Sequence, residues 1–88
     1  MVWIVELDPL AEKDLSKLDK QVALRILKFL NERLKISKNP RLLGEHLKGK
    51  YSDYWKYRVG DYRIISRIID SNVTIMVIKI GNRREVYR

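Results

Sequence analysis

The sequence predicts an α+β domain in which a helical hairpin packs on one face of a mainly antiparallel sheet. Apolar residues recur at helical spacing in the first half of the chain and at strand spacing in the second half. The turn and cap residues between these segments give the order β-α-α-β-β-β. Helices and strands that are segregated along the chain are typical of the α+β class. We expect a single domain that spans residues 1–88.

The first third of the chain predicts one strand and two helices. Residues 2–7 are mostly apolar and β-branched, which favours a short strand. Asp8 and Pro9 predict a helix start, because aspartate can cap free backbone N–H groups and proline suits the first helical position. Asp19 predicts a second N-cap, and the helix after it extends to about residue 36. Its buried face is expected to be an apolar stripe made of Val22, Ile26, Leu27, Leu30 and Leu34.

The middle of the chain, residues 37–53, is the least regular part of the sequence. The pair Asn39-Pro40 predicts the end of the second helix, because proline disfavours helical geometry in the residue before it. Gly44 and Gly49 interrupt the rest of this segment, so we expect no regular element there. Three leucines are expected to hold the segment against the core, namely Leu42, Leu43 and Leu47.

The second half of the chain predicts three antiparallel strands. Residues 54–59 and 62–69 flank the pair Gly60-Asp61, and glycine first in a two-residue loop predicts a type II′ turn. A polar turn separates this hairpin from residues 73–80. That run is almost continuously apolar, as expected of a central strand.

The net charge favours a polyanionic partner. The formal charge is +8 and the isoelectric point is near 9.9. Residues 51–88 hold six arginines and two lysines, whereas residues 1–50 hold three arginines and eight lysines. A guanidinium presents a flat fork of donors that matches phosphate oxygens, so we expect phosphate contacts in the second half. A solvated, lysine-rich surface is the alternative that charge alone leaves open.

Residue types exclude several kinds of site. The chain has no cysteine, which excludes disulfides, cysteine-ligated zinc and thiol nucleophiles. The single histidine, His46, excludes a two-histidine ribonuclease mechanism and disfavours a zinc site. No cofactor or metal is therefore expected. The sequence has no signal peptide and no apolar run of about 18 residues that could span a membrane, so we expect a cytoplasmic protein without membrane contact.

The predicted turn decides which hairpin residues share a face. If Gly60-Asp61 is the loop, Val59 pairs with Tyr62 and Arg58 pairs with Arg63, and the two faces alternate along each strand. The face expected to meet the helices holds Trp55, Tyr57, Val59, Tyr62, Ile64 and Ser66. The opposite face holds Tyr54, Lys56, Arg58, Arg63, Ile65 and Arg67.

The opposed arginines on the second face indicate a functional site. Like charges that face each other destabilise a sheet, and an anion between Arg58 and Arg63 would relieve their repulsion. We therefore interpret this face as a phosphate-binding surface. The alternative is a solvated face whose arginines pair with Asp53, Asp61 or Glu85.

Four segments resemble toxins of the RelE/ParE superfamily. They are Asn39-Pro-Arg-Leu-Leu-Gly44, Leu47-Lys-Gly49, Trp55-Lys-Tyr-Arg-Val-Gly-Asp-Tyr-Arg63 and Ile80-Gly-Asn-Arg-Arg-Glu-Val-Tyr87. The hairpin motif is shared by both branches, and the last segment is more similar to the RNA-cutting RelE branch. The resemblance implies a RelE-like toxin of a type II toxin–antitoxin pair. Such a toxin enters the ribosomal A site and cuts mRNA by 2′-hydroxyl attack, without a metal, and a RelB-like antitoxin neutralises it.

The resemblance implies a catalytic site made of Lys56, Arg63, Arg83 and Tyr87. Arg63 and Arg83 would hold the scissile phosphate. Lys56 would accept a proton, because neighbouring guanidinium groups favour its neutral form, and Tyr87 would stack on a base or orient the 2′-hydroxyl. Arg58 stands where some members carry a second lysine and would hold the RNA backbone. The other expected RNA contacts are Arg67, Arg84, Tyr54 and Lys48.

Two other functions remain open at this point. A ParE-like inhibitor of DNA gyrase would share the fold and the hairpin, but it would not need Lys56, Arg83 and Tyr87 together. A catalytically dead module would bind RNA or the ribosome without producing new RNA ends.

Overall fold

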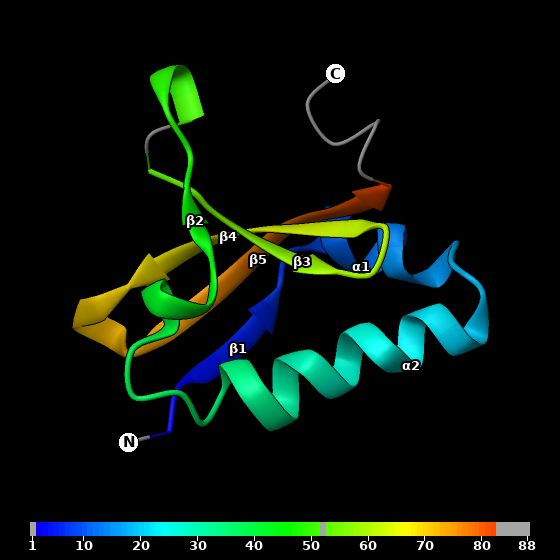
Figure 1. Cartoon of the computed structure of the whole chain (residues 1–88), viewed down its shortest axis with the longest axis horizontal. Coiled ribbons are helices and arrows are strands. Elements are labelled where there is room, and N and C mark those ends of the chain that lie inside the picture. Colours follow the sequence, from blue (N-terminus) through cyan, green and yellow to red (C-terminus); the bar gives the residue numbers. More distant parts are fainter. Residues whose placement is uncertain (1, 52, 83–88) are drawn as a thin grey trace.

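The computed structural model describes residues 2–51 and 53–82 and confirms the predicted α+β class. Helices α1 and α2 both lie on one face of the sheet (Figure 1). Strand β1 (Ile4–Leu7) is followed by α1 (Pro9–Ser16) and α2 (Lys20–Phe29). The remaining strands are β2 (Glu45–His46), β3 (Trp55–Val59), β4 (Tyr62–Ile69) and β5 (Thr74–Asn82).

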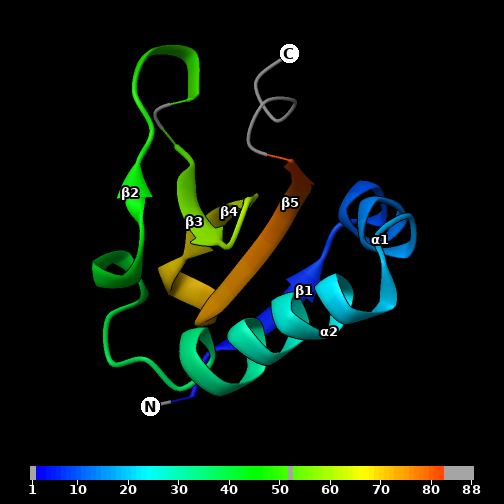
Figure 2. The same ribbon diagram turned by 45° about the vertical axis from the view of Figure 1, so that its right-hand side comes forward.

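The strands form a single sheet in the order β1-β5-β4-β3-β2. Strand β1 runs parallel to β5, and each of the other neighbouring pairs is antiparallel. Strand β5 therefore lies between the first strand of the chain and the β3–β4 hairpin (Figure 2). This mixed sheet keeps the mainly antiparallel character that the sequence predicts.

The helical hairpin follows the predicted caps in part. The Asp8 carboxylate accepts a hydrogen bond from the Leu10 N–H at 3.4 Å, which confirms the first cap. Asp19 is the N-cap residue of α2, as predicted, but its side chain makes no capping hydrogen bond and only its carbonyl oxygen accepts from the Ala23 N–H. Helix α2 ends at Phe29 and continues as one π-helical turn over Leu30–Leu34, so the regular helix is shorter than predicted.

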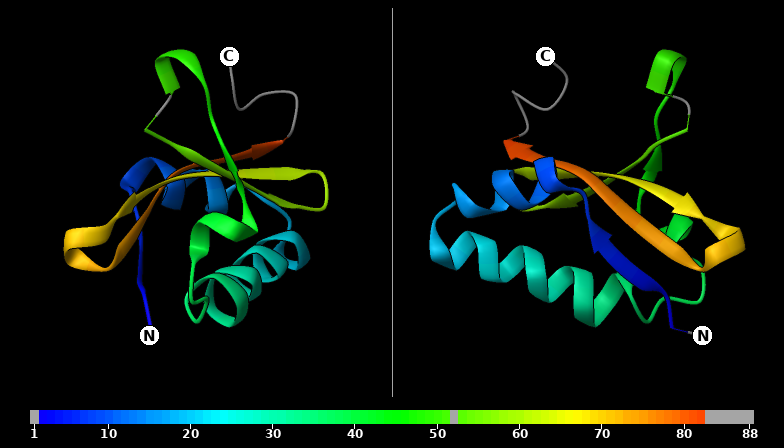
Figure 3. Two further views of the ribbon diagram at one scale, coloured as in Figure 1. Left: turned by 60° about the vertical axis from the view of Figure 1, so that its left-hand side comes forward. Right: turned by 180° about the vertical axis from the view of Figure 1, so that it is seen from behind.

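The core lies between the helices and the sheet (Figure 3). The predicted stripe on α2 is confirmed, since Ile26, Leu30 and Leu34 are fully buried. Each such side chain contributes about 1.5–3 kcal/mol when it is removed from water. The other buried members are Trp3, Ala11, Tyr57, Ile64, Ile75, Val77 and Ile80.

The hairpin register agrees with the predicted one in all five pairs of β3 with β4, from Trp55 with Ser66 to Val59 with Tyr62. Gly60 has a φ of +59°, the geometry that a type II′ turn requires at its first loop position. Strand β5 starts at Thr74, one residue later than predicted, because Val73 adopts a left-handed φ of 49°.

The segment of residues 37–51, which we call the strap, contains regular structure that the sequence does not predict. It holds a 3-10 turn (η2, Pro40–Leu43), strand β2 and a second 3-10 turn (η3, Gly49–Tyr51). These short elements agree with the prediction of a segment with little regular structure, but strand β2 itself was not predicted, because its two exposed polar residues carry no hydrophobic alternation. The predicted anchoring role of Leu42 was wrong, since its side chain is 81% exposed.

Candidate functional site

The outer face of the β3–β4 hairpin carries the predicted basic cluster. Arg58 and Arg63 lie directly opposite each other, and Lys56 lies two residues before Arg58 on the same face. The three side chains line a pocket of about 110 Å³. The strap closes one side of this pocket with Leu43, Gly44 and Glu45. The hairpin and the strap therefore build the site together.

The two opposed arginines give the pocket a fixed positive charge. Arg58 and Arg63 are cross-strand neighbours of like charge, an arrangement that disfavours the sheet locally. Arg58 Nε donates a hydrogen bond to the Gly60 carbonyl oxygen at 3.2 Å, which holds this side chain near the tip of the hairpin. An anion between the two groups would offset their repulsion and accept hydrogen bonds from both.

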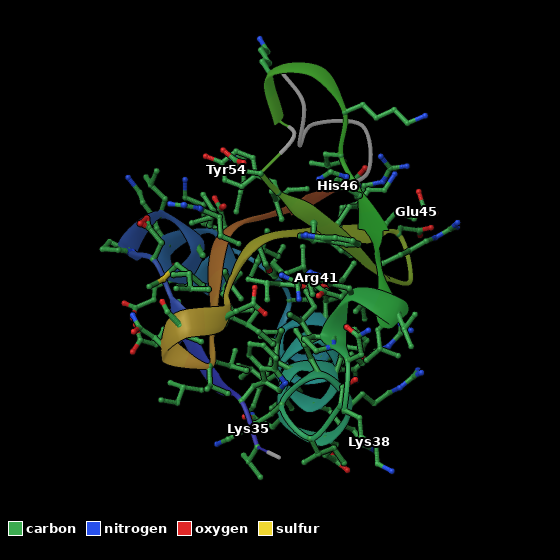
Figure 4. The ribbon with its side chains drawn as sticks, turned by 90° about the vertical axis from the view of Figure 1, so that its left-hand side faces the viewer. Lys35, Lys38, Arg41, Glu45, His46 and Tyr54 are labelled. Carbon is green, nitrogen blue, oxygen red and sulfur yellow. The ribbon has the colours of Figure 1, made fainter. Side chains whose placement is uncertain are left out.

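A glutamate that the sequence argument missed also lines the pocket. Glu45 lies opposite Lys56 in the β2–β3 ladder, and its Oε2 is 3.2 Å from Lys56 Nζ. Figure 4 shows Glu45 and His46 at successive positions of this strand. Lys56 therefore shares its pocket with the two arginines that the sequence predicts beside it and also with a carboxylate that the sequence does not predict. Face parity cannot be assigned to a strand that is not predicted, so the sequence offers no clear signal for Glu45.

Two contacts hold the strap against β3. A Cβ atom on Gly44 would lie 2.6 Å from the Lys56 carbonyl oxygen and 2.8 Å from the Tyr57 ring, so only glycine allows this approach. The buried Tyr57 hydroxyl donates a hydrogen bond to the Pro40 carbonyl oxygen at 2.8 Å. Burial raises the pKa of Tyr57 to about 12, against a smaller opposing effect of the Arg41 charge. The phenol thus stays protonated and keeps donating.

Arg41 anchors the strap to the far end of the sheet. Its guanidinium binds both carboxylate oxygens of Asp70, in the β4–β5 turn, at 3.0 and 2.6 Å. The hydrogen bond from Arg41 holds the pKa of Asp70 below its ordinary value of 3.8. The Arg41 guanidinium also lies 5.8 Å from the Trp55 ring centroid, and the His46 ring packs 4.9 Å from the same ring. These contacts fix the position of β2 and therefore of Glu45.

Comparison with known proteins identifies the family of this chain. Residues 5–87 match the model described as the ParE toxin of a type II toxin–antitoxin system, parDE. The chain belongs to the RelE/ParE toxin superfamily. The mRNA interferase toxin RelE of Escherichia coli is 33% identical over 90 residues, which cover 99% of this chain and 92% of that protein. Toxin RelG of Mycobacterium tuberculosis is 27% identical over 88 residues, covering 100% of this chain and 99% of that toxin.

Solved RelE structures share the fold of this RelE/ParE toxin. In a RelE–RelB complex from Pyrococcus horikoshii, the matching chain has a TM-score of 0.76 at 27% identity, over 98% of this chain and 100% of that chain. A RelBE toxin–antitoxin complex from Mycobacterium tuberculosis gives a TM-score of 0.87 at 24% identity, over 97% and 95% of the two chains. The RelE-like fold predicted from the sequence is thereby confirmed.

The structure of this RelE/ParE toxin brings only part of the predicted site together. Lys56, Arg58 and Arg63 meet at the pocket. Arg67 shares the outer face but does not line the pocket, and neither does Lys48 on the strap or the half-buried Tyr54. The remaining predicted residues lie outside the described ones, namely Arg83, Arg84 and Tyr87. Within the described ranges, no helix is long and apolar enough to cross a membrane.

Proposed function

We propose that this toxin is a ribosome-dependent endoribonuclease that cuts mRNA in the ribosomal A site without a metal. The observation that carries the proposal is the pocket in which Arg58, Arg63, Lys56 and Glu45 meet. Relatives in Escherichia coli and Shigella flexneri carry the name mRNA interferase, which supports this activity. Because its proposed targets are ribosomes and mRNA, we propose that the toxin acts in the cytoplasm.

RNA cleavage of this kind requires a proton acceptor and positively charged groups that stabilise the negative charge on the phosphate. The 2′-hydroxyl oxygen attacks the adjacent phosphorus while a base removes its proton, and the bond from phosphorus to the 5′-oxygen breaks as that oxygen takes up a proton from an acid or from water. The products are a 2′,3′-cyclic phosphate and a 5′-hydroxyl. Arg58 and Arg63, which stay charged throughout, would stabilise the charge on the phosphoryl oxygens. Arg83 and Tyr87, from the motif of residues 80–87, are proposed to complete the site, as the resemblance implies.

The Glu45–Lys56 pair is the proposed proton carrier. Among the four charged side chains that line the pocket, only these two can take up and release a proton, because guanidinium groups keep theirs. The sequence motif implies that Lys56 accepts the proton. The carboxylate of Glu45, which contacts Lys56, is a second group that can accept it. Separate replacement of the two residues tests whether each of them is needed for the step.

Primer extension on an mRNA during cell-free translation tests the proposed function. Purified toxin should produce cuts within codons when ribosomes are present and none when they are removed. Lys56→Ala and Arg63→Ala should each abolish the cuts, whereas the control Lys13→Ala, on the exposed side of α1, should cut normally. Intact mRNA with active wild-type toxin would contradict the proposal. Ribosome binding without new RNA ends would indicate a catalytically dead module instead.

We also propose a RelB-like antitoxin as the partner that neutralises the toxin. The structural neighbours include complexes of RelE with RelB from Pyrococcus horikoshii and Escherichia coli. A toxin with a net charge of +8 would capture an acidic antitoxin segment rapidly. Co-expression with the neighbouring antitoxin gene should restore growth and yield a stable complex.

Inhibition of DNA gyrase is the second candidate function. The matching family model is described as the ParE toxin, which favours this alternative. A gyrase inhibitor would block DNA supercoiling in a purified assay and would remain toxic after Lys56→Ala. Loss of toxicity in that variant, with normal folding, would favour mRNA cleavage.

A further inference from the structure

A second basic surface lies next to the tip of the β3–β4 hairpin. Arg25 and Lys28 come from α2, and Arg33 comes from the π-helical turn after it; all three are exposed. Together with Arg58 they border a hollow of about 450 Å³, which Phe29, Val59 and Gly60 also line. We call these four basic residues the α2 surface. Because Arg58 also lines the Lys56 pocket, the two basic regions are continuous.

The cations of the α2 surface have no acidic partners among the described residues. The ion pairs described in residues 2–51 and 53–82 use Arg41, Lys56 and Lys79 as their basic members, and none of the four α2-surface residues takes part. The Arg33 guanidinium lies 5.8 Å from the centroid of the Phe29 ring instead. Four cations that make no ion pair among the described residues surround one hollow, a conflict that folding does not require, and such conflicts gather at functional sites.

The tip of the hairpin borders the α2 surface. A Cβ atom built on Gly60 would lie 3.4 Å from an Arg25 guanidinium nitrogen, so the turn lies beside this cation. The neighbours in the hollow are mainly apolar, and they offer few groups that could read the edges of bases. Arginine and lysine in such a setting contact phosphates, which position a nucleic acid without reading its sequence.

We propose that the α2 surface binds the phosphodiester backbone of folded RNA while the Lys56 pocket holds the strand that is cut. The pocket of about 110 Å³ has room for little more than one phosphate group, so a strand held there leaves the larger hollow for a second RNA segment. This inference rests on the proposed function in that the folded RNA belongs to the same ribosomal target. It adds a docking surface that the cutting chemistry does not use.

Two matched triple variants test the α2 surface. The first carries Arg25→Gln, Lys28→Gln and Arg33→Gln. The control carries Lys13→Gln, Lys17→Gln and Lys20→Gln, which are exposed residues in α1, just after it and at the start of α2. Each triple lowers the formal net charge from +8 by three, to +5. Thermal melting checks that both triple variants fold. If the α2 triple variant does not fold, the single variant Lys28→Gln replaces it in the measurements.

The measured quantity is the affinity for purified, vacant ribosomes over a series of salt concentrations. The α2 triple should bind at least about tenfold more weakly, and its salt dependence should fall by roughly one unit of slope for each lost phosphate contact. The control should stay close to wild type. In the cutting assay, the α2 triple should need more ribosomes for half-maximal rate but reach the same maximal rate.

The outcomes separate this inference from the proposed function. Equal ribosome affinity of the α2 triple and the control overturns the inference, whether or not the wild-type toxin cuts mRNA. Weak binding of the α2 triple alone supports it, even if wild type binds ribosomes without cutting. If the α2 triple binds ribosomes normally but loses affinity for a synthetic acidic peptide, the surface serves a protein partner and the RNA inference is wrong.

Discussion

The ion pair of Glu45 with Lys56 sets the chemistry of the pocket at the scale of single residues. Its two charged atoms are 3.2 Å apart, and the Lys56 side chain is 20% exposed whereas the Glu45 side chain is 78% exposed, so the carboxylate is open to water and to a substrate. Exposed ion pairs add only about 0–1 kcal/mol to folding stability. The value of this pair is therefore expected in catalysis rather than in the fold.

The variant Glu45→Gln should lose cutting activity while it keeps the fold. An amide cannot accept the proton, so the single-turnover rate at saturating ribosomes should fall by at least about 100-fold, the usual range for a lost acid–base group. Glu32→Gln, at an exposed position after α2, is the matched control. An unchanged rate in Glu45→Gln would leave Lys56 as the acceptor.

The Arg41–Asp70 pair should make stability depend on pH in acid. The pKa of Asp70 is lowered in the folded protein, mainly by the hydrogen bond from Arg41. Because its pKa is lower in the folded protein, ionised Asp70 stabilises the fold at pH values above 3.8. This stabilisation is lost as the pH falls through the pKa of Asp70 in the folded protein. Asp70→Asn should therefore lower the urea midpoint near neutral pH but not in strong acid. A constant difference across this range, or the same behaviour in the exposed control Asp53→Asn, would contradict this explanation.

At the scale of structural elements, the strap matters because it places Glu45 beside Lys56 at the edge of the β3–β4 hairpin. It is fixed by the close approach of Gly44 to β3 and by the Tyr57 and Arg41 contacts. Strand β3 pairs with β4 on one side and with β2 on the other, so the inner sheet positions β3, and β3 positions β2. Activity should therefore respond to changes in the strap that leave the core intact.

The variant Gly44→Ala tests this dependence. The new Cβ would meet the Lys56 backbone oxygen at 2.6 Å, so the strap must shift away from β3. We expect a loss of about 1–3 kcal/mol in unfolding free energy, as for other overpacked sites, together with a loss of cutting. Gly49→Ala is the comparison, because its φ of +68° is strained but its Cβ would meet open space. Gly49→Ala should cost about 1 kcal/mol and leave the cutting rate unchanged.

The sequence predicts the hairpin well and the strap poorly, for physical reasons. Gly60-Asp61 fixes the turn, and alternation along β3 and β4 then fixes the faces, so the meeting of Lys56, Arg58 and Arg63 follows from local rules. Strand β2 forms because tertiary contacts of Gly44 and Tyr57 hold it there, and neither contact is visible in its own two residues. Glu45 could not be placed for that reason.

Charge is the property that matters most at the scale of the whole molecule. The radius of gyration is 12.1 Å, close to the screening length of about 10 Å in 0.1 M salt. The cations on the outer face and on α2 therefore act together on an approaching polyanion at low salt. Near 1 M salt, where the screening length is about 3 Å, only groups in direct contact still act.

The association rate constant of the toxin with ribosomes should therefore fall steeply as salt rises. Electrostatic steering acts before contact, so dissociation should change less than association. Stopped-flow mixing with fluorescently labelled toxin measures both rates. An association rate that is independent of salt would show that the net charge of +8 does not guide binding.

The position of β5 also constrains when the toxin can become harmful. Strand β5 is bonded on one side to β1 and on the other to β4, yet it is the last of the described strands to be synthesised. Until it emerges, β1 has no partner in the sheet, and the helices lack Ile75, Val77 and Ile80 to pack against. A nascent chain therefore cannot close its core while the second half of that strand is still inside the ribosome that makes it. The pocket on the β3–β4 hairpin therefore has no folded scaffold behind it until synthesis has passed β5.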